Sequence, residues 1–193
     1  MRSASTVLLA AALLLGSAAA SAHTTHFAGS FSAEVPGASG SGTLALEYDS
    51  DGHSLLIQAT WAGLSGVTTN AHIHCCTLNA NAGTAGVALA QGGMLPLFPL
   101  GVASGSYTKI IDLTDTAQYS NTFLAGSGGT VASAEARLIA NLTSGQAYFN
   151  IHTNNFPGGE IRTFVTVVPE PGTYALMLGG LGLLGLTVRR RRG

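Results

Sequence analysis

The 193-residue sequence is poor in charge, and five of its eight lysines and arginines lie near its two ends. Residues 23–168 keep only the three cations Lys109, Arg137 and Arg162 against eight carboxylates, which gives them a formal charge of −5. Such a surface repels phosphate backbones, and no glycine-rich loop with a phosphate-binding lysine is present, so nucleic acid is excluded from the expected partners.

The first 22 residues have the pattern of a secretory signal peptide. Arg2 precedes an apolar run at 7–15, and Ala20, Ser21 and Ala22 form a small-residue cleavage site. We therefore expect residues 1–22 to be removed on export and the mature chain to begin at His23.

Alternating apolar residues predict β-strands in the first half of the exported chain. Residues 24–35 are typical of an edge strand, because Pro36 stops further pairing. Residues 44–61 predict a hairpin that turns at 50–52, where serine, aspartate and glycine favour a reversal.

The second half contains the only segment with a helical pattern. A long glycine-rich connection at 77–99 leads to a strand at 107–113, and 116–124 is ambiguous. Apolar residues four apart predict a helix at 132–142. We therefore expect one mostly β domain, an antiparallel sandwich or barrel with one short helix.

The segment from Tyr148 to Val165 is the clearest strand pair. Asparagines, proline and glycines at 154–159 predict a turn between two alternating arms. The polar face carries Asn150 and His152 on the first arm, with Glu160 and Arg162 on the second. We expect Asn150, Glu160 and Arg162 to form a hydrogen-bonded and ionic cluster that stabilises the hairpin.

Three histidines suggest a metal site. His72 and His74 project from one face of a strand at 70–76, about 6.5 Å apart, and His152 on another strand can supply a third nitrogen. Three imidazoles suit copper or zinc, and Cys76, on the same face, is a candidate fourth ligand.

The alternative is a structural cluster in which neutral imidazoles bond to neighbouring side chains and carbonyls and tie two strands together. The adjacent Cys75 and Cys76 are unusual, because exported thiols rarely stay free. A bridge between them, ligation of a metal and disulfides between molecules all remain open.

Three stretches resemble the CHRD domain, which was first described in chordin and is common in exported bacterial proteins. They are SAEVPG at 32–37, AHIH at 71–74 and NIHTNNFPGGEIR at 150–162, in the family's order and at about its spacing. Cys75 and Thr163 stand where the family usually has glycine. The resemblance implies a CHRD domain at 23–167, and the order of the histidines also resembles copper-zinc superoxide dismutase in outline. Since the histidines and aspartate for a second metal are missing, dismutation is not expected.

The C-terminal residues 168–193 resemble a PEP-CTERM sorting signal. Pro169, Glu170 and Pro171 precede an apolar segment at 174–188, which ends in Arg189, Arg190, Arg191 and Arg192. Fifteen helical residues span only about 22 Å, less than the hydrocarbon core of a bilayer, so the segment suits a temporary anchor. The resemblance implies that an exosortase removes this tail from a precursor held in the inner membrane.

The sequence therefore predicts an exported, non-enzymatic component of the cell surface or extracellular matrix, with exopolysaccharide as a plausible partner. No serine-histidine-acid set or carboxylate pair indicates an enzyme, and no cofactor is required by this interpretation. The alternative function is an extracytoplasmic copper or zinc protein, with redox activity as one form of it.

Overall fold

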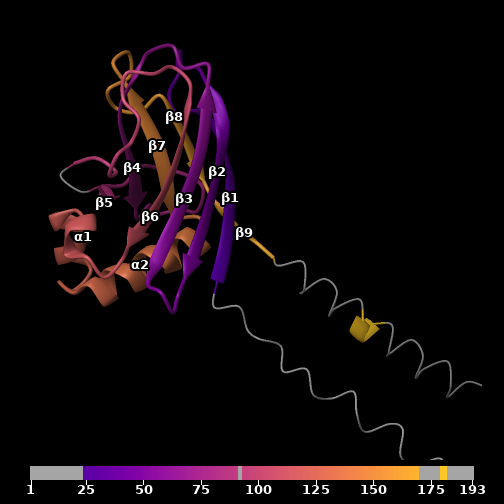
Figure 1. Cartoon of the computed structure of the whole chain (residues 1–193), viewed down its shortest axis with the longest axis vertical. Helices are drawn as coiled ribbons and strands as arrows, with labels where there is room; N and C mark the ends of the chain where they lie inside the picture. The colour runs from indigo at the N-terminus through magenta and orange to yellow at the C-terminus, as the bar shows by residue number, and fades with distance from the viewer. Residues whose placement is uncertain (1–23, 91–92, 170–178, 182–193) are drawn as a thin grey trace, which may run out of the picture.

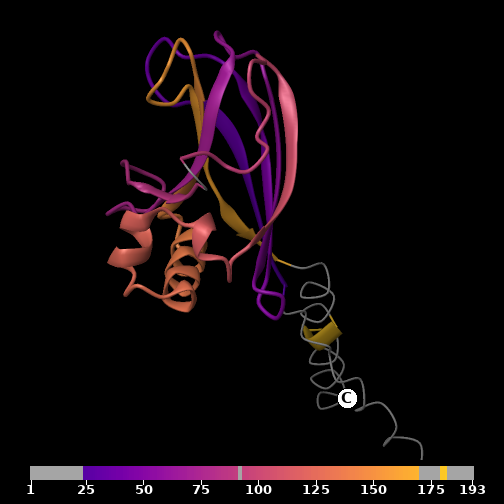
Figure 2. The ribbon, with the colours of Figure 1, turned by 60° about the vertical axis from the view of Figure 1, so that its left-hand side comes forward.

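The computed structural model describes residues 24–90, 93–169 and 179–181. Within these ranges, nine strands form one antiparallel sheet, which curls into a half-barrel whose two sides face each other (Figure 1 and Figure 2). The order along the sheet is β5-β4-β7-β8-β1-β2-β3-β6, and β9 pairs with β1. The predicted antiparallel β architecture is confirmed. The strands are β1 (Thr24–Ala33), β2 (Ser41–Asp49), β3 (Ser54–Ala62), β4 (Thr68–Cys75), β5 (Val87–Leu89), β6 (Gly105–Asp112), β7 (Ala147–Thr153), β8 (Ile161–Phe164) and β9 (Thr166–Val168).

Strand β1 links the two sides of the curled sheet. Most of its length pairs with β2, but its last residues, Ser32 and Ala33, pair with β8 instead. A strand that exchanges partners in this way bends the sheet, since its two ends follow different neighbours. The next residue along the chain, Glu34, is thereby placed beside β7 and β8.

The core lies between the two sides. On β3, alternate residues from Leu55 to Trp61 point inward, and Trp61 stacks on Phe98 with ring centroids 5.0 Å apart. Phe31 of β1 meets Phe149 of β7 edge to face at 5.7 Å, which joins the two sides. The period-two pattern of the sequence therefore identified the buried faces correctly.

Two helices lie together at one end of the sheet (Figure 1). Helix α2 (Val131–Thr143) is the predicted helix; Thr130 caps its first turn, and Leu138 and Leu142 are buried beneath it. A single 3₁₀ turn (Thr116–Gln118) precedes helix α1 (Asn121–Gly126), which was not predicted. Helix α1 has six residues and buries one large side chain, Phe123, so it is too short to show a helical period.

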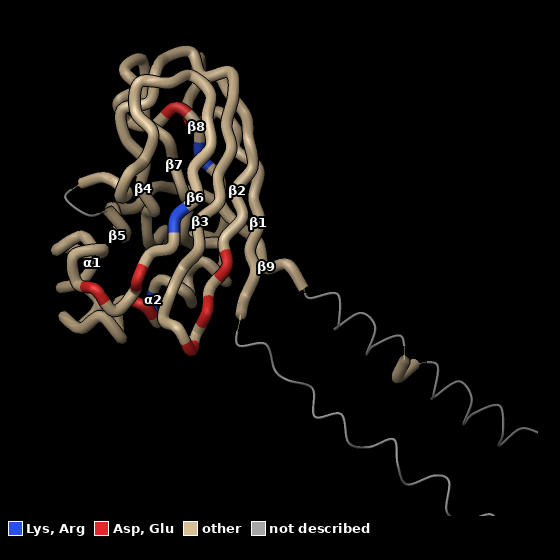
Figure 3. The backbone as a smooth tube through the Cα atoms, in the orientation of Figure 1, with Lys and Arg blue, Asp and Glu red and all other residues tan. Residues whose placement is uncertain are grey.

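Charged residues are unevenly spread over the described chain. Figure 3 shows carboxylates near the β2–β3 turn and beside α2, while few charges lie along the middle of the strands.

The two ends fall largely outside the described residues: the predicted signal peptide does so, as do Glu170, Pro171 and Arg189–Arg192. Among the residues described, no helix is long and apolar enough to cross a membrane.

Candidate metal site

Strands β4 and β7 place the three histidines side by side. The two strands pair so that His72 lies opposite Asn150, His74 opposite Tyr148, and His152 opposite Asn70. Residues two apart on a strand share a face, so two side chains from each strand meet on one side of the sheet. Sequence alternation had predicted this arrangement for the histidines.

The three imidazoles approach closely and are buried. Their exposed fractions are 8 % for His72, 9 % for His74 and 8 % for His152. The Nδ1 atom of His72 lies 3.0 Å from Nε2 of His152. One nitrogen of each ring lies within 4.8 Å of the others, and among the residues described this is the group of histidine, cysteine and acidic side chains close enough to hold a metal ion.

The other nitrogen of each ring faces a backbone carbonyl. His72 Nε2 lies 2.6 Å from the Gly93 oxygen, and His74 Nδ1 lies 2.8 Å from the Ala85 oxygen. His152 Nδ1 lies 2.8 Å from the Pro157 oxygen. Because a carbonyl oxygen only accepts hydrogen bonds, each of these outer nitrogens must carry a proton and donate it.

Burial favours the neutral form of two of the rings. It lowers the pKa of His72 to about 4, despite the opposing effect of the hydrogen bond to Gly93. Burial also lowers the pKa of His74, again against its bonds to backbone carbonyls. A neutral imidazole with a protonated outer nitrogen presents a lone pair on its inner nitrogen, so these two rings direct lone pairs into the cluster.

Asn150 lies at the centre of the cluster. Its Oδ1 atom is 3.1 Å from Nε2 of His74 and 3.1 Å from Nε2 of His152. Its Nδ2 atom donates to Oε2 of Glu34 at 3.3 Å, which orients the amide oxygen toward the imidazoles. The cluster therefore gathers several acceptors around one point, and a positive charge there, whether a proton or a metal ion, relieves their mutual repulsion.

Glu34 was missed as a member of this network. Its carboxylate also lies 3.7 Å from Nη1 of Arg162, whose guanidinium lies over the ring of Tyr148. Burial raises the pKa of Glu34, and the bond from Asn150 and the charge of Arg162 partly oppose that rise. The only sequence signal for Glu34 was its place in the SAEVPG stretch, since 116 residues separate it from Asn150.

Glu160 does not join the predicted hairpin cluster with Asn150 and Arg162. It precedes β8 and follows Gly159, whose φ of +126° interrupts the alternation on which the prediction depended. Its carboxylate instead accepts hydrogen bonds from Thr153 Oγ1 and the Ser65 N–H, both at 2.6 Å. Burial alone would raise the pKa of Glu160, but these bonds outweigh it and lower the pKa. The structure joins Asn150 and Arg162 through Glu34.

Cys76 is bonded to Cys75 in a disulfide. In that state its sulfur is not a free thiolate, and the group of three histidines does not include it. Of the sorting-signal residues, Pro169 ends the second described range, so the structure carries no information on the rest.

Comparisons with known proteins agree with these motifs. A family model for the CHRD domain matches residues 23–165. The chain belongs to the CHRD family. The CHRD domain thus contains every member of the histidine network, from Glu34 to Arg162. A model for the PEP-CTERM protein-sorting motif matches residues 167–192, which implies an exported, membrane-anchored precursor that an exosortase processes. No curated protein and no solved structure matches the chain.

Proposed function

We propose that this CHRD protein binds one copper or zinc ion through His72, His74 and His152. After its export and sorting, it acts as a binding component of the cell surface or matrix, and not as an enzyme. The observation that carries the metal site is the fixed orientation of the three rings. Each donates its outer N–H to a backbone carbonyl and presents its inner nitrogen to the others.

This orientation is typical of metal ligands. Histidines that bind metals usually donate their second ring nitrogen to a carbonyl or carboxylate, which fixes the ring and its tautomer. Three imidazole nitrogens suit copper or zinc better than calcium or magnesium, which prefer oxygen. The Oδ1 atom of Asn150 lies beside the inner nitrogens and can serve as a further metal ligand. Glu34, which accepts a hydrogen bond from the Asn150 amide, supplies negative charge that lowers the cost of a buried cation.

A purely structural cluster explains the same contacts less well. Strands are tied together when a donor meets an acceptor, but the inner nitrogens of His72 and His152 face each other at 3.0 Å. With its outer nitrogen protonated and its pKa lowered by burial, His72 has no inner proton to give, so this contact needs a second proton on the other ring or a cation between the two nitrogens. A bound cation turns this unfavourable contact into two ligand bonds.

The matrix setting has independent support from the outer face of the sheet. A shallow groove of about 670 Å³ crosses β1, β2, β3 and β6 and contains no charged residue. Its polar side chains are hydroxyls and one amide, which suit the hydroxyls of an uncharged or weakly charged polysaccharide. They are Ser30, Thr43, Gln58, Thr60, Ser106, Thr108 and Thr166.

Elemental analysis tests the metal site. The full chain is expressed in a host that exports it, in medium with added copper and zinc, and the purified protein is analysed for both metals. We expect about one ion per chain, lost in His152→Phe and in His74→Phe. In the wild-type protein the ring of His74 stacks on that of Tyr148 with centroids 4.8 Å apart. Phenylalanine at position 74 keeps a ring there, so this variant should preserve the fold.

His53→Gln is the matched control. It also removes a histidine bonded to another side chain, because His53 Nδ1 lies 2.9 Å from the buried carboxylate of Glu135, but it lies outside the cluster. The control should keep its metal. Wild-type protein without bound copper or zinc, or variants that keep it as the control does, would refute the proposed site.

A further inference from the structure

The disulfide between Cys75 and Cys76 joins neighbouring residues at the end of β4. A disulfide stabilises a fold mainly by closing a loop between distant residues, and the effect grows with loop length. A bridge between neighbours closes no such loop, so its contribution to the free energy of unfolding through loop closure is minimal. The role of this bond therefore lies in its reactivity, and the characteristic reaction of a disulfide is exchange with thiols.

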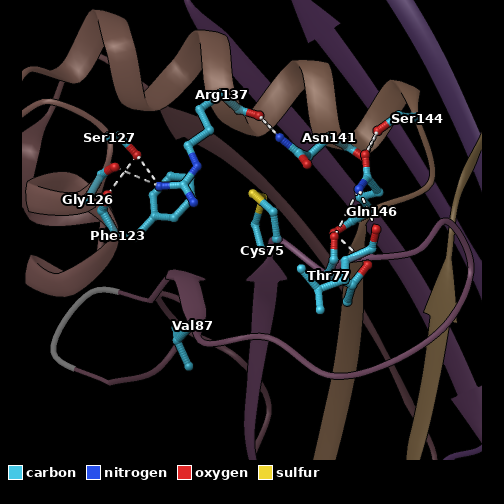
Figure 4. The surroundings of a disulfide bond; sticks show 12 residues. Cys75, Thr77, Val87, Phe123, Gly126, Ser127, Arg137, Asn141, Ser144 and Gln146 are labelled. Atoms are coloured by element: carbon cyan, nitrogen blue, oxygen red, sulfur yellow. Dashed lines mark hydrogen bonds between the residues drawn. A yellow bond between two sulfur atoms is a disulfide. The ribbon is translucent and has the colours of Figure 1, made fainter.

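Cys75 lines a pocket of about 490 Å³ between the sheet and the two helices. Val87 of β5 forms one side, Phe123 of α1 another, and Arg137 of α2 a third. Figure 4 shows the Cys75 sulfur pointing from the end of β4 toward the helix that carries Arg137. The volume is in the range of pockets that bind small molecules. Only 5 % of Cys75 is exposed, but the residue lines this pocket, so a small thiol that enters it approaches the disulfide from the Cys75 side.

Arg137 gives the pocket a positive wall. Its Nη1 atom donates to the Gly126 carbonyl at 2.9 Å and to Ser127 Oγ at 3.3 Å, and its guanidinium lies 5.1 Å from the centre of the Phe123 ring. Within the described part of the chain no carboxylate forms an ion pair with it, unlike Arg162, which meets Glu34. A fixed, unpaired guanidinium attracts anions, even though residues 23–168 are acidic as a whole.

We propose that this pocket is a thiol-exchange site for a small anionic thiol. The thiolate attacks Sγ of Cys75, a mixed disulfide forms, and the bond to Cys76 breaks so that Cys76 leaves as a thiolate and takes up a proton. A second thiol molecule then attacks the sulfur that the first one contributed to the mixed disulfide. Cys75 leaves as a thiolate and is protonated in turn. Two thiols are thereby oxidised to one disulfide, and the cysteine pair gains two electrons and two protons.

The test measures charge selectivity in the purified, exported protein. Rates of opening are measured anaerobically, by alkylation and mass spectrometry, with anionic glutathione and with neutral 2-mercaptoethanol. Each rate is divided by that for a small exposed disulfide, which removes differences in intrinsic reactivity. We expect the normalised rate with glutathione to exceed that with mercaptoethanol by about five- to tenfold at low salt, and the excess to shrink at high salt.

Two variants assign this selectivity to the pocket. Arg137→Gln should abolish the excess, while Lys109→Gln, which removes the same charge from β6 outside the pocket, should leave it. If Arg137→Gln does not fold, Arg137→Met, which keeps an unbranched side chain over Phe123 but removes the charge, replaces it and should likewise abolish the excess. A disulfide that resists both thiols, a wild-type ratio equal to that of the exposed disulfide, or equal effects of the two glutamine variants would each overturn the proposal.

Discussion

Replacing Gly159 with alanine should destabilise the protein far more than the same change at its neighbour Gly158. Gly159 has φ +126°, a conformation that alanine rarely adopts, and a Cβ there would overlap Oε2 of Glu34 and lie 2.9 Å from Nδ2 of Asn150. The backbone strain costs about 1–3 kcal/mol, and displacing the buried Glu34 carboxylate from the Asn150 amide costs about 1–2 kcal/mol more. We therefore expect Gly159→Ala to lower the free energy of unfolding by about 3 kcal/mol.

Urea denaturation followed by circular dichroism measures this loss. Gly158→Ala is the control, because no atom lies within 4 Å of a Cβ at that position and its φ is not in the positive region. We expect the control to stay within about 0.5 kcal/mol of wild type. If the two variants differ by less than 1 kcal/mol, then Glu34 is not held against Gly159 and Asn150, and the assigned network is wrong. Since Asn150 would lose its orientation, Gly159→Ala should also weaken metal binding.

Four further outcomes are expected. Copper or zinc at 100 times its dissociation constant should stabilise metal-free protein by about 2.7 kcal/mol, raising Tm by about 8 °C in a thermal scan, whereas His152→Phe should show no rise. Burial raises the pKa of Tyr107 to about 12. The folded state then keeps a proton that the unfolded chain loses near pH 10. The contribution of this proton to the free energy of unfolding should therefore be complete below pH 10 and decrease as the pH rises toward 12. Urea titrations at pH 9 and pH 11 should show a smaller loss of stability in Tyr107→Phe than in wild type. Glu170→Ala should leave uncleaved precursor in the membrane fraction on an immunoblot, and normal release would contradict exosortase sorting. Thr60→Glu, which puts a carboxylate into the outer groove, should reduce cosedimentation with the producing cell's exopolysaccharide, while Ser32→Glu outside the groove should not.

Features that depend on neighbouring residues could be predicted from the sequence. Alternation located the strands and placed His72 and His74 on one face, since a strand repeats every two residues. It also placed Asn150 and His152 together. Alternation failed at Glu160, where Gly159 reverses the backbone just before β8 begins.

Features that depend on distant segments could not be predicted in the same way. The carbonyls of Gly93, Ala85 and Pro157, which determine the tautomers of the histidines, come from three loops whose paths no local pattern specifies. The contact between Glu34 and Asn150 depends on β1 exchanging β2 for β8 at its end. The choice of side chains by residue type therefore identified the three proposed ligands, but neither their protonation nor the carboxylate of Glu34 behind them.

The three stretches that resemble the CHRD family converge on one buried network, and the polar groups of this network support the proposed cation site. The first stretch supplies Glu34, the second His72 and His74, and the third Asn150, His152 and Arg162. Burying so many polar groups costs free energy unless each finds a complementary partner. The outer nitrogens bond to backbone carbonyls, and the Asn150 amide donates to Glu34, whereas the inner nitrogens of His72 and His152 and the amide oxygen of Asn150 face one another. Tying two strands together would need only one donor and one acceptor, so the converging lone pairs support the proposed metal ion over a purely structural cluster.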